Sequence, residues 1–231
     1  MTGGDRIFPR IFPLGDSALT VEFGNEISVE LNERAIALSD HFESQPFPGF
    51  IETVPAYAST TIFFDIARVQ AAFPGLATAF DAVRILAEKA LKQNRNTAKN
   101  LRQTVEIPAH FDPKSALDLE HIAEVHGLSR REVIDIFTSR IYRVFMLGFL
   151  PGFTYMAEVD ERIATPRKDA PRTAVPKGSI GIAGRQTGIY SLESPGGWQI
   201  IARTDIEMFT PDGERPTLFE AGDHVRFVPA K

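Results

Sequence analysis

The 231-residue chain contains 43% hydrophobic and 24% charged residues, which is the composition of a folded protein and not of a disordered one. Its formal net charge of −5 argues against general binding to nucleic acid or to an anionic membrane, although a local basic site is not excluded. The absence of cysteine excludes disulfides, thiolate nucleophiles and cysteine-ligated zinc. The five histidines show no metal-ligand spacing, so we expect no metal site. Neither a signal peptide nor a membrane-spanning apolar run is evident, and we expect a soluble cytoplasmic protein.

The first hundred residues alternate between patterns typical of strands and of helices. Strand patterns cover residues 10–15, 18–23 and two runs within 52–65, and helical spacing covers residues 28–43 and 73–92. With a further strand at 103–107, this order predicts a ferredoxin-like α+β domain. The polar, asparagine-rich stretch 93–100 is the expected linker, which gives domains 1–100 and 101–231.

A pair of helices is expected within residues 115–140, separated by a helix stop at Gly127. Each helix follows a capping-box pattern, Ser115 with Asp118 and Ser129 with Glu132. One interpretation is a helical hairpin packed on a barrel. The alternative is a DNA-binding helix-turn-helix, because Ala123, Gly127 and the apolar pair 133–134 have the spacing of that motif. The second helix also carries Arg130, Arg131 and Arg140. The acidic chain and the acidic residues of the same helix favour the hairpin.

From Tyr142 onward, glycine and proline recur every few residues between short apolar runs. These strand-like runs cover residues 143–147, 179–183, 188–190, 198–204 and 224–228. Many short strands with closely spaced turns predict a barrel or a sandwich. Because glycine and proline at this density also fix the backbone around a pocket, we place the functional surface within residues 142–211.

Positive charge is concentrated between residues 165 and 204, a segment that contains six basic residues and only two acidic ones. The basic residues are Arg167, Lys168, Arg172, Lys177, Arg185 and Arg203. Guanidinium groups match carboxylates and phosphates, so the segment favours an anionic ligand over the alternative of a solvated loop surface. Nearby, the small-residue run 181–188 offers main-chain N–H groups that can approach an oxyanion, although it matches no phosphate-loop motif.

The aromatic run from Phe149 to Tyr155 surrounds a Pro-Gly turn and is expected to line a ligand pocket or a contact between subunits, with a packed barrel rim as the alternative. Trp198 is expected either to cover a pocket or to fill the barrel. No Ser-His-Asp or Cys-His arrangement is present. The residues alone therefore indicate an anion-binding enzyme site without specifying its reaction.

Several motifs in this segment resemble one protein family. They are LGFLPGFTY at 147–155, Pro-Arg pairs at 166–167 and 171–172, VPKGSIGIAG at 175–184, QTGIY at 186–190, SPGGW at 194–198, and AGDHVRF at 221–227. This dense set is similar to the family that contains the B subunit of 5-oxoprolinase. The family also includes allophanate hydrolase subunit 1, part of the carboxyltransferase domain of urea carboxylase, and the kinase inhibitor KipI.

The resemblance implies an α+β N-terminal domain followed by a cyclophilin-like β-barrel with an inserted helical hairpin. It also implies two partners, one like the C subunit and one like the A subunit of 5-oxoprolinase, with which the chain opens 5-oxoproline to glutamate in an ATP-dependent reaction. ATP is implied for the complex as a whole and can bind on a partner. The substrate is a small-molecule amide or carboxylate, and neither nucleic acid nor a membrane is implied as a partner.

The resemblance also assigns roles to individual residues. The implied substrate- and anion-binding residues are Arg167, Arg172, Arg185, Gln186, Thr187 and Arg203. The residues expected to line the pocket are Phe149, Phe153, Tyr155 and Trp198 from the aromatic pattern above, to which the resemblance adds Tyr190. The candidates for acid–base catalysis are Glu193, Tyr190 and Lys177, and the catalytic residue itself is not identified.

The chain departs from the family pattern at a few positions. Phe137 replaces a usual histidine, residues 110–119 replace a glycine-rich motif, Lys177 replaces alanine, and Asp205 replaces proline. An imidazole is the most convenient acid–base group at neutral pH. Its loss leaves an alternative function open: a regulatory binding module resembling a histidine-kinase inhibitor, without turnover of its own.

Overall fold

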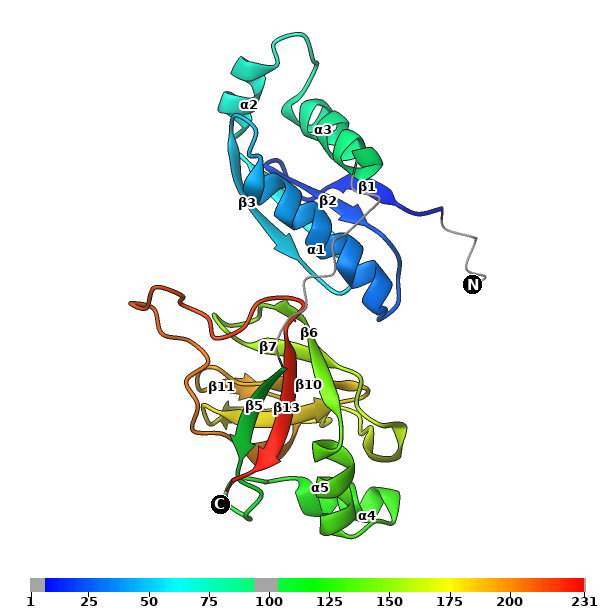
Figure 1. Ribbon diagram of the computed structural model, residues 1–231, viewed down its shortest axis with the longest axis vertical. Helices are drawn as coiled ribbons and strands as arrows, with labels where there is room; N and C mark the ends of the chain where they lie inside the picture. The colour runs from blue at the N-terminus through cyan, green and yellow to red at the C-terminus, as the bar shows by residue number, and fades with distance from the viewer. Residues whose placement is uncertain (1–6, 94–103, 231) are drawn as a thin grey trace. The chain divides into compact units, whose positions relative to one another are not determined.

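The computed structural model describes residues 7–93 and 104–230 and divides into two compact units between Asn100 and Leu101 (Figure 1). Both units combine helices with antiparallel strands, so the predicted α+β class is confirmed. None of the described helices is long and apolar enough to cross a membrane.

The first unit contains a four-stranded antiparallel sheet with the strand order β1-β2-β4-β3. Its strands are β1 (Arg10–Pro13), β2 (Ala18–Glu22), β3 (Phe50–Pro55) and β4 (Ser59–Phe64), and its helices are α1 (Val29–Ser44), α2 (Ile66–Ala72) and α3 (Ala79–Gln93). Alternate residues of β4 are buried, as expected for a strand with one face on a core. Ser28 and Asp65 begin α1 and α2 by accepting main-chain N–H groups through their side chains.

The second unit contains a nearly closed seven-stranded, barrel-like sheet with the order β12-β9-β10-β7-β6-β13-β5. Its strands are β5 (Thr104–Ala109), β6 (Ile141–Leu147), β7 (Thr154–Ala157), β9 (Ser179–Ala183), β10 (Gln186–Ile189), β12 (Gln199–Arg203) and β13 (His224–Pro229). A separate ribbon pairs β8 (Arg172–Val175) with β11 (Ser194–Gly196). A 3-10 turn, η1 (Glu161–Ile163), follows β7.

The two edge strands of this sheet, β5 and β12, meet just beyond the end of β5. His110 and Arg203 exchange main-chain hydrogen bonds of 2.7 and 3.0 Å there. This bridge satisfies polar groups that an open sheet edge would leave unpaired.

The strand predicted at residues 103–107 does not complete the first sheet, and that part of the ferredoxin-like prediction is wrong. β5 instead pairs in parallel with β13, the last strand of the chain, as the adjacent green and red arrows in Figure 1 show. Ile107 and Ala109 of β5 are buried in the second core. A short strand pattern gives no information about its partner, because strand pairing depends on contacts between distant residues.

The helix pair consists of α4 (Leu119–His126) and α5 (Arg130–Thr138), separated by Gly127 at a left-handed φ of 65°. The second capping box is confirmed, since the main-chain N–H of Ser129 donates to Glu132 at 2.8 Å and that of Glu132 donates to Ser129 at 3.2 Å. The first is wrong, because α4 begins at Leu119 with Asp118, not Ser115, as its N-cap residue, and the Asp118 side chain makes no capping hydrogen bond. The basic residues behind the DNA-binding alternative are ion-paired: Arg130 with Glu120, Arg131 with Asp135, and Arg140 with Asp160.

Phe137, at the position where the resemblance leads one to expect a histidine, lies in the core of the second unit. Its ring centroid is 5.1 Å from that of Tyr142 and 5.0 Å from that of Phe227, and all three side chains are fully buried. Burial also raises the pKa of the Tyr142 hydroxyl, which donates to the carbonyl of Phe137 at 2.9 Å. Position 137 in this chain is therefore a packing position, where a side chain reaches no ligand.

We expect Phe137→Ala to lower the free energy of unfolding by about 3–5 kcal/mol, because it empties a closely packed aromatic site. Urea denaturation followed by circular dichroism measures the change. Ile141→Thr, at a half-exposed position of β6, is the control and should cost less than about 1 kcal/mol. Equal losses for the two variants would contradict the packing role.

Candidate functional site

The five aromatic residues predicted to line a pocket lie together on the second unit. Phe153 is central, and its ring centroid lies 4.6 Å from that of Tyr155, 5.0 Å from Tyr190, 5.5 Å from Phe149 and 5.6 Å from Trp198. Phe153, Tyr190 and Trp198 are buried, whereas Phe149 is 62% exposed. The set, here called the aromatic cluster, is thus a small packed core with one exposed edge.

Two glycines of the family motifs allow this close packing. A Cβ atom on Gly196 would lie 2.3 Å from the Tyr190 hydroxyl oxygen, and one on Gly188 would lie 2.7 Å from the carbonyl oxygen of Thr154. Real side chains essentially never come this close. The glycines in SPGGW and QTGIY are therefore required by the cluster.

The tyrosine hydroxyls of the cluster are held in their protonated form. Burial raises the pKa of Tyr190, against smaller opposing effects from the Trp198 main-chain N–H and Arg167. Burial likewise raises the pKa of Tyr155, and Arg167 again opposes it. Both groups can donate hydrogen bonds at neutral pH, but neither is suited to act as a general base.

A buried carboxylate, Asp118, lies just before α4. It accepts hydrogen bonds from Arg172 at 2.7 Å, from Lys168 at 3.1 Å and from the main-chain N–H of Ile200 at 2.7 Å. Its side chain is only 4% exposed. The carboxylate therefore ties together α4, the loop that follows Thr165, and β12.

These bonds also control the ionisation of Asp118. Burial alone would raise the pKa of the carboxyl, but the Arg172, Ile200 and Lys168 hydrogen bonds outweigh burial and hold it below its ordinary value. A carboxyl whose pKa is lowered by folding stabilises the protein above its unfolded pKa. That contribution is lost as the pH falls through the lowered folded pKa.

We expect Asp118→Asn to lower the free energy of unfolding at pH 7 by about 3–5 kcal/mol, because two cations lose their buried counter-charge. The variant should also lose less stability than the wild type on acidification below pH 3.8, the ordinary carboxyl pKa. Urea titrations at several pH values measure both effects. Asp135→Asn, which removes only the exposed pair with Arg131, is the control and should cost at most about 0.5 kcal/mol. An unchanged acid profile for Asp118→Asn would contradict this account.

A cavity of about 470 Å³ lies beside this network, between α4 and the loop from Thr165 to Ala170. His121 and Val125 of α4 form one wall, and the loop supplies Arg167 and Lys168. Arg167 also places its guanidinium carbon 5.8 Å from the centre of the Trp198 ring, within the range of a cation–π contact. The cavity therefore adjoins the aromatic cluster through Arg167.

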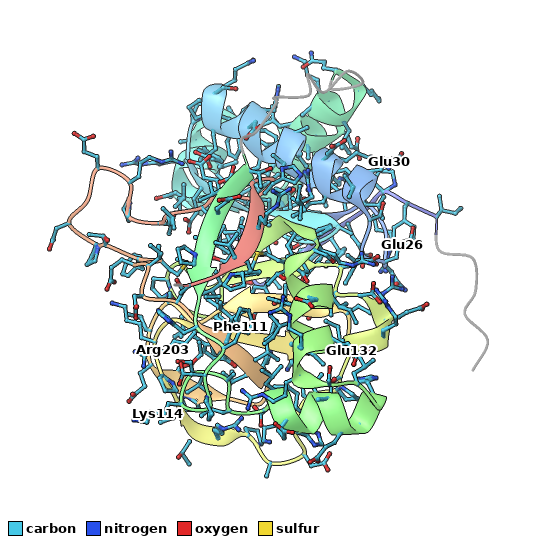
Figure 2. The ribbon with its side chains drawn as sticks, turned by 60° about the horizontal axis from the view of Figure 1, so that its bottom comes forward. Glu26, Glu30, Phe111, Lys114, Glu132 and Arg203 are labelled. Atoms are coloured by element: carbon cyan, nitrogen blue, oxygen red, sulfur yellow. The ribbon has the colours of Figure 1, made fainter. Side chains whose placement is uncertain are left out.

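The six residues predicted to bind an anion do not gather at one point. Arg167 and Arg172 lie beside the cluster, where both act on the ionisation of Tyr190. Arg185 follows the end of β9 and pairs with Glu158 at 2.8 Å. Arg203, labelled in Figure 2, lies opposite Ser179 in the register of β12 with β9. Its side chain donates to the carbonyl of Lys177 at 3.0 Å. Arg185 and Arg203 thus lie at opposite ends of one strand.

The other predicted site residues also have defined places. Thr187 is buried within the sheet and donates to the carbonyl of Gly181 at 2.9 Å, next to Gln186 in β10. Lys177 pairs with Glu207, and Glu193 is exposed just before β11. None of the three catalytic candidates forms an acid–base pair with another of them in the described residues. Those residues also contain no group of three histidines or acids that could hold a metal ion.

Sequence reasoning missed Asp118, His121 and Gln199 as members of this region. The sequence pattern placed Asp118 in a capping box, and it gave no role to His121 beyond excluding the histidines as metal ligands. The only signal in the sequence was an acidic residue, Asp118, just before an apolar helix, together with the several basic residues of the later segment 167–172. Only the fold shows that the two are neighbours.

Comparison of the sequence with known protein families identifies the family to which the chain belongs. Residues 9–219 match the family described as "Carboxyltransferase domain, subdomain C and D". The chain belongs to this family. The match includes both units and every site residue named above, so the carboxyltransferase-domain assignment applies to nearly the whole chain.

Two curated relatives are similar to nearly the whole of this chain. The B subunit of 5-oxoprolinase from Bacillus subtilis (strain 168) is 44% identical over 220 residues, which cover 95% of this chain and 92% of the relative. The B subunit of 5-oxoprolinase from Escherichia coli O157:H7 is 32% identical, with 96% of each chain covered. The crystal structure of TTHA0988 superposes with a TM-score of 0.79 at 34% identity, covering 93% of this chain and 40% of that longer one.

Proposed function

We propose that the chain is the B subunit of an ATP-dependent 5-oxoprolinase, or of a closely related amide-hydrolysing complex. The observation that supports this most is the 44% identity to the B subunit of a 5-oxoprolinase over almost the full length of both proteins. In this proposal the chain works with partners that resemble the C and A subunits, and the reaction consumes ATP, water and 5-oxoproline to yield glutamate.

The geometry of the site supports a binding role for this chain. Arg167 presents a positive charge beside the aromatic cluster, and it has no ion-pair partner in the described part of the chain. Lys168 and Arg172 are engaged with Asp118, and the cluster tyrosines stay protonated. These groups bind and orient an anion but do not supply a base. The reacting groups, and the ATP site, then lie on a partner or at a composite site.

The proposal predicts ATP-dependent glutamate formation when the chain is mixed with its A-type and C-type partners and 5-oxoproline. Arg167→Gln should lower kcat/KM by about tenfold or more, because it removes a charge that contacts the anionic substrate. Coupled assays of glutamate and ADP measure the turnover.

Arg131→Gln is the matched control, since Arg131 is exposed on α5 and paired with Asp135, away from every predicted site residue. It should leave kcat/KM within about twofold of the wild type. Absence of turnover in a mixture whose partners are active with a different B-type protein would reject the substrate assignment.

The regulatory alternative rested on Phe137 and on the lack of a complete catalytic set. Because Phe137 is a buried packing residue, its identity removes no group from the surface. The incomplete catalytic set fits one component of a larger enzyme equally well. No specific observation favours the regulatory alternative over the enzyme assignment.

A further inference from the structure

A second cavity, of about 620 Å³, lies in the first unit between α1 and α3. The two helices pack there with β2 and β4 around the core of that unit. The volume is within the range of small-molecule binding sites. No residue that carries the proposed function lines this cavity, so it is a candidate site of its own.

The helix faces that border this cavity carry charge. On each helix the lining residues have the spacing of a single face: Arg34, Ala37 and Leu38 on α1, and Arg84, Glu88, Leu91 and Lys92 on α3. A helix face turned toward a neighbouring helix is ordinarily apolar. The lining here contains three basic residues and one acidic residue, in a chain whose net charge is −5, and it therefore favours an anionic ligand.

The buried part of the lining is apolar. Phe23 and Leu38 are only 2% and 1% exposed, and both belong to the core of the first unit. Ile11 and Leu91 are partly buried against the same core. None of these four side chains can form a hydrogen bond, so the ligand group that contacts them is a hydrocarbon.

Arg34 joins the charged part of the lining to the apolar part. Its guanidinium carbon lies 4.8 Å from the centre of the Phe23 ring, which is a cation–π contact. Within residues 7–93 and 104–230, Arg34 has no carboxylate partner, and Arg84 has only an ion pair of 3.6 Å with Asp81. Both guanidinium groups therefore have N–H donors left for a carboxylate.

Glu88 limits the charge of the ligand. It is the one acidic residue of the lining, and it lies four residues from both Arg84 and Lys92 on the same helix. These neighbours offset its charge, but a carboxylate at this position still repels an approaching anion. The lining thus suits a single negative charge better than a double one.

We propose that this cavity binds a monocarboxylate whose body is an alkyl chain or an aromatic ring. The hydrocarbon part contacts Phe23 and Leu38, and the carboxylate pairs with Arg34 and Arg84. The proposal does not depend on the proposed function, because the residues that carry that function all belong to the second unit.

The test is calorimetric titration of the full chain, without partners, with octanoate as the probe. Octanol and octylamine have the same chain without the negative charge, and acetate has the charge without the chain. We expect each of these three compounds to bind at least about tenfold more weakly than octanoate, because each lacks one of the two features that the lining matches.

Variants of the lining locate the site. Ala37→Phe should weaken octanoate binding by about tenfold or more, because the added ring occupies the cavity, and Arg34→Gln should weaken it by about tenfold. Glu88→Gln should strengthen binding by about twofold to threefold, an effect that a loss of stability would not produce. Lys89→Gln, on α3 but outside the lining, is the control and should bind within about twofold of the wild type.

Three results would overturn the proposal: no octanoate binding up to about 10 mM, equal binding of octanoate and octanol, or unchanged binding by Arg34→Gln. Arg34 and Glu88 are exposed, so their variants test the site even where Ala37→Phe does not fold. An inactive complex whose isolated chain still binds octanoate would reject the proposed function and leave this site supported.

Discussion

The buried charge of Asp118 is the constraint on which the candidate site depends. A carboxylate taken out of water is costly unless its oxygens are well paired, and here three donors from distant parts of the chain converge on it. The loop from Thr165 to Pro171 has almost no regular secondary structure of its own. Asp118 holds Lys168 and Arg172. The main-chain N–H of Lys168 also donates to the carbonyl of Gly197, and the Gln199 side chain donates to the carbonyl of Pro166. The position of Arg167 over Trp198 is a consequence of that attachment.

The basic residues between Arg167 and Arg172 have two different structural roles. Lys168 and Arg172 are structural counter-charges, held in place by a buried acid. Arg167 is exposed, contacts an aromatic ring and keeps its charge for a ligand. Counting basic residues along the sequence cannot separate these two roles, because the count contains no information about which cation faces a buried acid.

Local patterns in the sequence were sufficient for much of the fold. The Ser129–Glu132 cap, the stop at Gly127 and the dense turns after Tyr142 are short-range signals, and each predicted its structure correctly. The pairing of β5 with β13, and the contact between Asp118 and Arg172, join residues far apart in the chain. Such contacts are set by tertiary packing, so the sequence did not reveal them. Phe137 shows the converse error, where a difference from a motif suggested chemistry at a position that serves packing.

The parallel pairing of β5 with β13 has a consequence for how the second unit can be joined to other proteins. Thr104 lies opposite His224 and Ala109 lies opposite Pro229, so the first and last strands of the unit run in the same direction. The chain therefore enters the barrel at one end of these strands and leaves it at the other, about 17 Å away. A reporter protein fused after Pro229 would therefore be attached about one strand length away from the start of β5. Its attachment point is separate from the point at which the preceding part of the chain joins the barrel.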